Sequence, residues 1–396
     1  MNQKSRRHEG NNESDWNESA RLESEEAIRR THRFVGRGWT LHHRDVREFF
    51  TEPPRDLYDG ILCDPPYGLG FMGHGWDKAV PPVEVWSQLH KACKPGAHLL
   101  AFGGPKTAHR LACNIEDAGW ELRDKVYWVH GEGMPKGQII GKMLAKLGHE
   151  VGGWLGYSTG LKPAVEPVIL ARKPLEGTLT ENVLKHGCGG LNIDGCRVGE
   201  SGGTRRSHQA PYPRNEDGAE DRTNWARSGH SVERIDKGRF PANIILDEAA
   251  AELLDRQSGH SRSRRSKRRL ANSNVGNDRT LGLFRSRLTA VEGYEDEGGA
   301  SRFLYVAKAS PKERAGNDHP TVKPLALCEY LARLILPPER RTPRRLLVPF
   351  SGSGSEIIGG LRAGWDHVTS IERDRHFCGV AVRRLCAERS HTATAG

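Results

Sequence analysis

The sequence predicts an α/β fold of the Rossmann type, with a mostly parallel sheet in a three-layer arrangement between two sets of helices. Short apolar runs of strand length alternate with amphipathic stretches of helix length between residues 39 and 129, and again between residues 302 and 387. The strand-like runs end in Gly, Pro or an acidic residue, which is typical of functional loops at the carboxyl ends of parallel strands. No apolar run approaches the roughly 20 residues that span a bilayer, so we expect no membrane segment.

The N-terminal region reads as a β-α-β-α-β succession. Pro95 and Gly96 end its first long helix, because proline cannot continue the helical hydrogen bonds. Gly103 and Gly104 close the strand that follows. The predicted elements are helices 23–34, 83–94 and 106–117 and strands 39–43, 58–63, 97–102 and 121–129.

The C-terminal region repeats this succession. Pro324 suits the first turn of a helix, and Gly364 suits the position just after another. Between the two regions, roughly from residue 175 to 300, Gly, Ser, Asn and charged residues dominate, so this stretch buries little apolar surface by itself and reads as an inserted module. The predicted elements are strands 165–171, 302–308, 345–349 and 367–371 and helices 247–257, 324–336, 355–363 and 374–387.

Composition limits the class of protein. The 396 residues can bury one large core with an inserted module, and 36% hydrophobic with 28% charged residues indicates a soluble protein. The N-terminus is polar and has no apolar signal-peptide core, so we expect a cytoplasmic protein. None of the eight cysteines forms a Cys-x-x-Cys pair, and no metal site is predicted.

The net charge of +10 is concentrated in one segment. Between Arg256 and Arg287 there are ten Lys or Arg residues and one acid, Asp278. Such a run suits a loop that contacts nucleic-acid phosphates, since each neutralised phosphate releases counterions; a solvated basic linker is the other reading. The residues expected to contact DNA from this basic loop, 256–288, are Arg262, Arg264, Arg265, Lys267, Arg268 and Arg269.

The stretch Asp64-Pro65-Pro66-Tyr67 follows the apolar run 58–63 and leads into a glycine-rich loop. The two prolines have no peptide N–H to donate to a neighbouring strand, and they hold φ at about −65°. The strand therefore ends here, and the carboxylate and phenol are fixed in space. Asp64 can accept hydrogen bonds from an amino group while Tyr67 stacks on a flat ring, which suits a base taken out of its duplex. A purely structural proline turn gives the same pattern.

Residues 346–372 form a second pattern: a strand, a Gly-x-Gly loop, a helix, a strand and then Glu372. Glycines let the backbone approach a ligand at the positive end of a helix, and the acid can bind both hydroxyls of a ribose. The third glycine of a dinucleotide fingerprint is missing at Glu356 or Ile357, and there is no P-loop lysine. A cofactor with a ribose and no pyrophosphate therefore fits better than NAD, and S-adenosylmethionine is such a molecule.

Together the two patterns resemble the S-adenosylmethionine-dependent amino-methyltransferases of DNA. Asp-Pro-Pro-Tyr comes first, a variable region follows, and the stretches 319–324 and 349–355 come last, an order similar to the β class of that family. The stretches 238–243 and 301–309 also resemble members of phage or mobile-element type. The resemblance covers about residues 38–175 and 300–388. It implies a circularly rearranged methyltransferase sheet, S-adenosylmethionine as cofactor and double-stranded DNA as partner, and the family's habit suggests a homodimer.

The resemblance implies a catalytic role for the proline turn. Asp64 and the carbonyl of Pro65 would receive the target amino group, Pro66 belongs to the same turn, and Tyr67 would stack on the flipped base. No covalent enzyme intermediate is required. Trp76 follows the turn closely, and it is expected either to touch DNA or to be buried.

The resemblance also implies cofactor contacts. The loop Pro349-Phe350-Ser351-Gly352-Ser353-Gly354-Ser355 would hold the methionine end, Glu372 the ribose hydroxyls and Asp45 the adenine amino group. Thr321 and Lys323 would belong to a loop that closes over the methionine moiety.

The resemblance leaves the target base with two readings. Asp-Pro-Pro-Tyr favours adenine N6, and cytosine N4 is the second reading. Methylation of RNA or of a protein glutamine, and DNA binding without catalysis, are more distant alternatives. Two positions depart from the family's pattern: Val348 stands where an acid is common, and Ser355 where a threonine is common.

The resemblance and the composition together give the expected domain boundaries. We expect a disordered N-terminal tail (1–30), a catalytic half (31–175), a target-recognition module (176–300), a cofactor-binding half (301–388) and a short C-terminal tail (389–396).

Overall fold

The structure is a computed structural model, and its contacts group the chain into two compact units. The first unit holds residues 1–123, 169–190 and 310–396, and the second holds residues 124–168 and 191–309. The expected disordered tail 1–30 lies outside the described residues. The structure describes residues 32–51, 55–70, 77–131, 133, 137–208, 230–262, 296–308, 317, 319 and 322–393.

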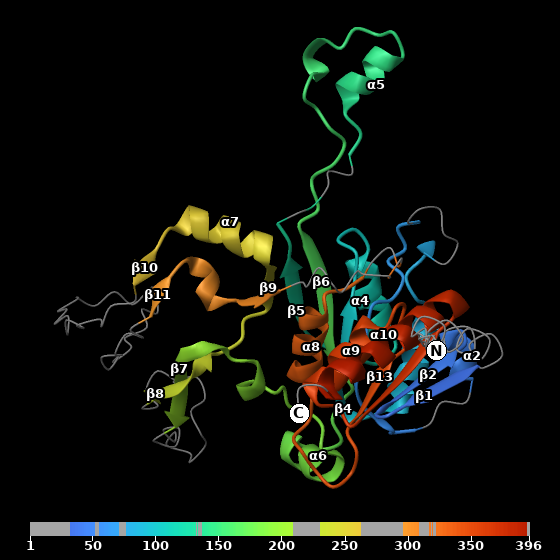
Figure 1. Ribbon diagram of the computed structural model, residues 1–396, viewed down its shortest axis with the longest axis vertical. Coiled ribbons are helices and arrows are strands. Elements are labelled where there is room, and N and C mark those ends of the chain that lie inside the picture. The colour runs from blue at the N-terminus through green and yellow to red at the C-terminus, as the bar shows by residue number, and fades with distance from the viewer. Residues whose placement is uncertain are drawn as a thin grey trace, which may run out of the picture. The chain divides into compact units, whose positions relative to one another are not determined.

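A parallel sheet forms the centre of the first unit (Figure 1). Its strands run in the order β1-β2-β14-β13-β3-β4, with β6 beside β4. The pairs from β2 to β4 are all parallel, and β1 pairs antiparallel with β2. The bounds are β1 Arg33–Gly36, β2 Trp39–His43, β3 Tyr58–Cys63, β4 Cys93–Phe102, β6 Val165–Arg172, β13 Arg345–Val348 and β14 His367–Glu372.

The register brings four strand ends to one edge of this sheet. Glu372 at the end of β14 pairs with His43 at the end of β2. Val348 at the end of β13 pairs with Ser370, and β13 also pairs with β3. The residues that follow these ends, the expected site residues among them, therefore share the carboxyl edge of the sheet.

One face of the sheet is covered by α3 (Val83–Ala92) and α4 (Ala108–Asp117). Trp86 and Ile115 of these helices belong to one buried cluster with Ile61 and Leu99 of the sheet. Each is fully buried, and burial of such a side chain contributes about 1.5–3 kcal/mol.

The opposite face is covered by α8 (Leu325–Leu334), α9 (Ser355–Ala363) and α10 (Arg375–Ala393), the orange and red helices of Figure 1. A Cβ atom on Gly60 of β3 would lie 3.1 Å from the side chains of Ile335 and Trp365, so glycine allows this close packing. The expected three-layer α/β sheet is confirmed.

Several elements of the first unit differ from the sequence-based expectation. The helix expected at 23–34 is wrong at its end, because Arg33–Gly36 is strand β1. A helix that was not expected, α6 (Leu179–His186), begins with a capping box between Thr178 and Glu181 and ends at Gly187, whose φ is 69°.

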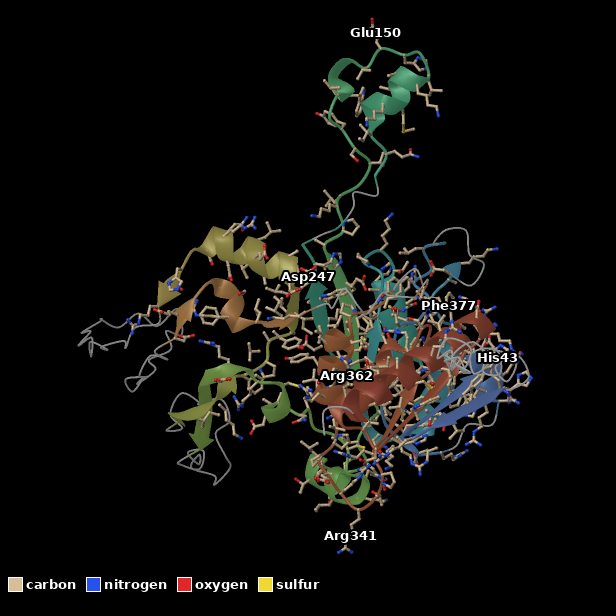
Figure 2. The ribbon with its side chains drawn as sticks, in the orientation of Figure 1. His43, Glu150, Asp247, Arg341, Arg362 and Phe377 are labelled. Carbon is tan, nitrogen blue, oxygen red and sulfur yellow. The ribbon has the colours of Figure 1, made fainter. Side chains whose placement is uncertain are left out.

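The second unit contains two short parallel pairings. β9 (Ile244–Asp247) pairs with β5 (Glu121–Val129) and with β12 (Tyr305–Ala307). Asp247, labelled in Figure 2, accepts a hydrogen bond from Ala250 N at 2.7 Å and caps α7 (Glu248–Ser258). The strand expected at 302–308 is shorter, since residues 300–303 form the 3-10 helix η6.

The rest of the second unit includes two antiparallel strand pairs and a further helix. The strands β7 (Val198–His208) and β8 (His230–Arg239) form an antiparallel ribbon, and β10 (Ser261–Arg262) pairs with β11 (Glu297–Gly298). The helix α5 spans Ile140–Lys146. No helix in the described parts of the chain has the length and apolar character needed to cross a membrane.

Candidate active site

Asp64, Tyr67 and Lys323 form a cluster at the end of β3. Tyr67 OH donates to Asp64 Oδ1 at 2.8 Å, and Lys323 Nζ donates to Asp64 Oδ2 at 2.8 Å. The same ammonium lies 3.1 Å from Tyr67 OH and over the rings of Tyr67 and Phe102, at 5.3 and 4.9 Å from their centroids. Lys323 is buried, so these contacts form in a poorly solvated place where charge interactions are strong.

Asp77 fixes the backbone of the turn that carries Tyr67. Its carboxylate accepts hydrogen bonds from the peptide N–H groups of Tyr67, Gly68 and Leu69 at 2.7, 2.8 and 3.2 Å. Gly68 has a φ of 68°, a conformation that favours glycine. The hydroxyl of Thr107 donates to the carbonyl of Tyr67 at 2.5 Å. Hydrogen bonds therefore hold the backbone of Tyr67 at both its N–H and its carbonyl.

The glycine loop joins β13 to α9. Gly352 and Gly354 have φ angles of 47° and 86°, and a Cβ on Gly352 would lie 2.9 Å from His319 Nε2. Ser351 N donates to the carbonyl of Ile371 at 3.0 Å, which ties the loop to β14. The hydroxyl of Ser351 is buried and has no hydrogen-bond partner among the described residues.

Glu372 connects this loop to the end of β14. Its Oε2 accepts from Gly352 N at 2.7 Å and its Oε1 from Asp374 N at 2.7 Å. Burial raises the pKa of this carboxyl to about 6, although the peptide N–H groups act in the opposite direction. Each oxygen retains a second lone pair, so the carboxylate can still accept from ligand hydroxyls.

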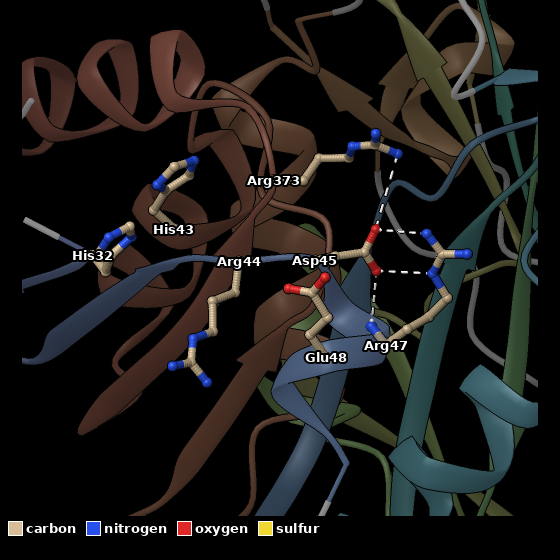
Figure 3. A pocket seen from close by; sticks show the side chains of 7 residues that line it. All are labelled: His32, His43, Arg44, Asp45, Arg47, Glu48 and Arg373. Atoms are coloured by element: carbon tan, nitrogen blue, oxygen red, sulfur yellow. Dashed lines mark hydrogen bonds and ion pairs between the residues drawn. The ribbon is translucent and has the colours of Figure 1, made fainter.

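A cavity of about 560 Å³ lies at the end of β2, around Asp45 (Figure 3). Arg44 N donates to the carbonyl of Glu372 at 2.9 Å, so one residue of the cavity lining contacts the backbone of that acid. The cavity is lined by His32, His43, Arg44, Asp45, Arg47, Glu48 and Arg373.

Asp45 is one of the two acids that line this cavity, the other being Glu48. Its Oδ1 accepts from Arg47 N and Nε at 2.9 and 3.0 Å, and its Oδ2 accepts from Arg47 Nη2 at 2.9 Å. The hydrogen bonds of Arg47 lower the pKa of the Asp45 carboxyl. Nδ1 of His43 is buried without a hydrogen-bond partner in the described part of the chain.

The structure brings most of the expected site residues to one edge of the sheet. Asp64 and Tyr67 stand together, the loop Pro349–Ser355 adjoins Glu372, and Asp45 follows β2. Arg262 lies in β10 of the second unit and is exposed. The remaining expected residues, Thr321, Trp76, Arg264, Arg265, Lys267, Arg268 and Arg269, lie outside the described residues.

Two residues of the site, Asp77 and Glu356, were not found from the sequence, and a contact of a third, Lys323, was not foreseen. Asp77 carried no local signal, since it acts on a turn ten residues away. The expected place of Lys323 at the methionine end of the cofactor stays a prediction, and its ammonium also donates to Asp64. In the sequence, Glu356 marks only a place where the third glycine of a dinucleotide fingerprint is missing. In the structure it is a buried acid in the first turn of α9. Among the described residues no three His, Cys, Asp or Glu side chains converge to hold a metal ion.

A parallel α/β sheet with a glycine loop, two acids at strand ends and an Asp-Pro-Pro-Tyr turn defines a class of nucleoside-binding transferase. The chain belongs to the DNA methylase family of the N6/N4 type, whose model matches residues 58–382. The resemblance to DNA amino-methyltransferases is thereby confirmed, while the phage or mobile-element type and the circular rearrangement stay predictions.

One curated relative is the Type II methyltransferase M.HindIII of Haemophilus influenzae. It is 29% identical over 133 residues, which cover 30% of this chain and 43% of the relative. The match thus spans less than half of that protein's length.

Several solved structures are similar to this chain over most of its length. They include a complex of M1.HpyAVI with SAM (14% identity, TM-score 0.39, covering 87% of this chain and 99% of that chain). Another is the cytosine-N4-specific PvuII DNA methyltransferase (13% identity, TM-score 0.41, 87% and 86% covered).

Proposed function

We propose that this protein transfers a methyl group from S-adenosylmethionine to the exocyclic amino group of a base in double-stranded DNA. The observation that carries the proposal is the position of two groups at the carboxyl ends of neighbouring strands. The cluster of Asp64, Tyr67 and Lys323 follows β3, and the glycine loop follows β13, which pairs with β3 through Leu347 and Ile61. This arrangement can bring an amino acceptor and a bound nucleoside close together.

The residues around the loop fit a nucleoside cofactor. Gly352 and Gly354 allow close backbone approach, and the buried hydroxyl of Ser351 has hydrogen-bonding capacity that no described residue uses. Glu372 would hold the ribose hydroxyls, and Asp45 would receive the adenine amino group. When bound, S-adenosylmethionine supplies an electrophilic methyl group on a positively charged sulfur.

Asp64 is the residue that we assign to the amino nitrogen of the base. The lone pair of that nitrogen is conjugated into the ring, which makes it a poor nucleophile. A carboxylate and the carbonyl of Pro65 that accept its hydrogens favour the pyramidal nitrogen of the transition state. As the nitrogen acquires positive charge, the negative charge of Asp64 stabilises it, and the proton that the nitrogen must lose is already directed at Asp64.

Tyr67 and Lys323 hold this carboxylate in place. The phenol and the ammonium each donate to a different oxygen of Asp64, which fixes the orientation of its plane. The ring of Tyr67 offers a face on which a flipped base can stack, and stacking offsets part of the few kcal/mol that unstacking the base costs.

Adenine N6 is the favoured target atom. The support is the aspartate at the first position of the Asp-Pro-Pro-Tyr turn, which in the resembling family favours adenine. Cytosine N4 is the second candidate, because an aspartate can accept hydrogens from either amino group. We assign the contacts with DNA phosphates to the basic loop. We also expect a homodimer, because the resembling family commonly forms dimers.

The experiment is methylation of DNA with S-adenosylmethionine that carries a labelled methyl group. Unmethylated double-stranded DNA is incubated with the wild-type protein, digested to nucleosides and analysed by mass spectrometry. We expect labelled N6-methyladenine and no label with Asp64→Asn, whereas labelled N4-methylcytosine would make cytosine the target. Label in RNA or in protein, with none in any DNA, would overturn the proposal.

A further inference from the structure

Glu356 is a buried acid that the proposed reaction leaves unused. It lies in the first turn of α9, directly after the glycine loop, and is only 3% exposed. Within the described part of the chain, no other residue donates a hydrogen bond to its carboxylate or forms an ion pair with it. Its own peptide N–H is the hydrogen-bond donor that approaches it. The carboxylate therefore has unused acceptor capacity in a place with little water.

The two cations whose charges act on Glu356 have other hydrogen-bond partners. Lys323 donates to Asp64 and Tyr67. Arg384 Nη1 donates to the carbonyl of Ser353 at 2.7 Å and to the hydroxyls of Ser353 and Ser355 at 3.1 and 3.2 Å. Neither cation donates to Glu356, so this carboxyl group can still accept hydrogen bonds from a further donor.

Ser351 supplies a second, independent observation on the same loop. Its hydroxyl is buried at 1% exposure and lacks a hydrogen-bond partner among the described residues. Buried hydroxyls are normally hydrogen-bonded, so an unpaired one next to the positive end of a helix indicates a place prepared for a polar ligand group.

We propose that Glu356 receives the positively charged amino group at the amino-acid end of S-adenosylmethionine, with the hydroxyl of Ser351 completing this subsite. The inference rests on the proposed function, because it names the part of the cofactor that this corner of the site binds. A primary ammonium has three donors and a full charge, and it meets both the charge and the acceptor requirements of the carboxylate.

The surroundings of Glu356 keep its carboxyl group protonated, so binding of the ammonium must displace that proton. Burial and the negative charge of Asp64 raise the pKa of Glu356 to about 8, and Lys323 and Arg384 act in the opposite direction. The neighbouring thiols of Cys63 and Cys328 are fully buried, and burial raises the pKa of each, so they stay neutral. Without ligand the Glu356 carboxyl is therefore mostly protonated at pH 7. When the ammonium binds, the carboxyl O–H bond breaks, the proton passes to buffer and the freed oxygen accepts an ammonium N–H.

The test is titration calorimetry of the full chain at pH 7 in two buffers of different ionisation enthalpy. The ligands are S-adenosylmethionine and 5′-methylthioadenosine, which keeps the nucleoside but lacks the amino-acid end with its ammonium group and has a neutral thioether in place of the sulfonium. For the wild type we expect S-adenosylmethionine to release close to one proton more than 5′-methylthioadenosine does. In Glu356→Gln this difference should disappear and the affinity for S-adenosylmethionine should fall roughly 10-fold or more, while the affinity for 5′-methylthioadenosine should stay unchanged.

The matched control is Glu388→Gln, a glutamate whose partly exposed carboxylate pairs with Arg362. It should behave as the wild type does. If the wild type binds both nucleosides with equal proton release, or if Glu356→Gln binds S-adenosylmethionine as tightly as the wild type, the inference is wrong and the proposed function stands. If the wild type binds neither nucleoside, the proposed cofactor itself is wrong. The wild-type proton release decides the question even where the Gln variant does not fold.

Discussion

Lys323 Nζ lies 2.8 Å from Asp64 Oδ2, although 259 positions separate the two residues in the chain. The contact joins the segment before α8 to the turn after β3. Because the same ammonium also reaches the phenol oxygen of Tyr67, Lys323 is a third member of the cluster and orients both of its partners. The segment that the sequence assigned to cofactor binding therefore also shapes the place assigned to the base.

Replacing Lys323 tests whether this residue acts on Asp64 or on the cofactor. In Lys323→Met the carboxylate of Asp64 loses its cationic partner, and we expect the single-turnover rate of methyl transfer to fall roughly 100-fold. The affinity for S-adenosylmethionine should change little. Lys323→Arg, which keeps the charge, should recover part of the rate. A large loss of cofactor affinity with a normal rate would instead support the original assignment of Lys323 to the methionine end.

Asp77→Asn tests the support of the catalytic turn. An asparagine has one acceptor oxygen and no charge, so the three peptide N–H groups of Tyr67, Gly68 and Leu69 lose part of their acceptors. Each buried donor left without a partner costs about 1–3 kcal/mol. We expect a lower melting temperature and slower methyl transfer with normal cofactor affinity. Asp117→Asn, at an exposed position of α4, is the control and should change neither.

The sequence predicted those site residues that stand at strand ends. Asp64 and Glu372 each follow a short apolar run, and the glycines of 349–355 follow another, so local patterns alone place them at the carboxyl edge of a parallel sheet. The fold class follows from the same alternation of strands and helices.

The contacts between distant segments could not be predicted in this way. Neither Asp77 nor Lys323 has a local pattern that identifies its partner, because the partners are brought together only by the packed sheet. The helix α6 is a different case. Thr178 and Glu181 form a capping box that is visible in the sequence and could have identified its start.

The pKa of Glu372 predicts a pH dependence of nucleoside binding. Burial raises this pKa from 4.5 to about 6, so the carboxylate is ionised at pH 7 and mostly protonated at pH 5. A protonated acid is a weaker acceptor for ribose hydroxyls, so affinity is present above pH 6 and lost below it. We expect the affinity for 5′-methylthioadenosine to fall about 10-fold between pH 7 and pH 5. In Glu372→Gln it should be low and constant; a wild-type affinity that does not change would show that Glu372 does not bind the ribose.

The basic loop should control how DNA affinity depends on salt. If Arg264, Arg265, Arg268 and Arg269 each neutralise a phosphate, changing all four to Gln should lower the slope of log affinity against log salt by about 3.6. The measurement is a fluorescence titration of duplex DNA over a range of salt concentrations. An unchanged slope would identify the segment as a solvated linker.

Asp59 should be important for the stability of the fold and not for methyl transfer. Its carboxylate is fully buried in β3 and pairs with Lys94 at 2.8 Å and with Arg340. It also accepts from Arg345 N at 2.8 Å and from the thiol of Cys188 at 3.3 Å. In Asp59→Asn two partly buried cations lose their counter-charge, and breaking such a pair from one side costs about 3–5 kcal/mol.

Chemical denaturation of Asp59→Asn should therefore show a much lower midpoint. The control is again Glu388→Gln, because its pair with Arg362, labelled in Figure 2, is more exposed and is expected to contribute at most about 1 kcal/mol. Asp59 lies in the second position of β3, and the cluster with Asp64 follows the last residue of that strand. Under conditions where Asp59→Asn is folded, its affinity for S-adenosylmethionine should equal that of the wild type. A selective loss of binding without loss of stability would show instead that the charge of Asp59 acts on the site through the strand.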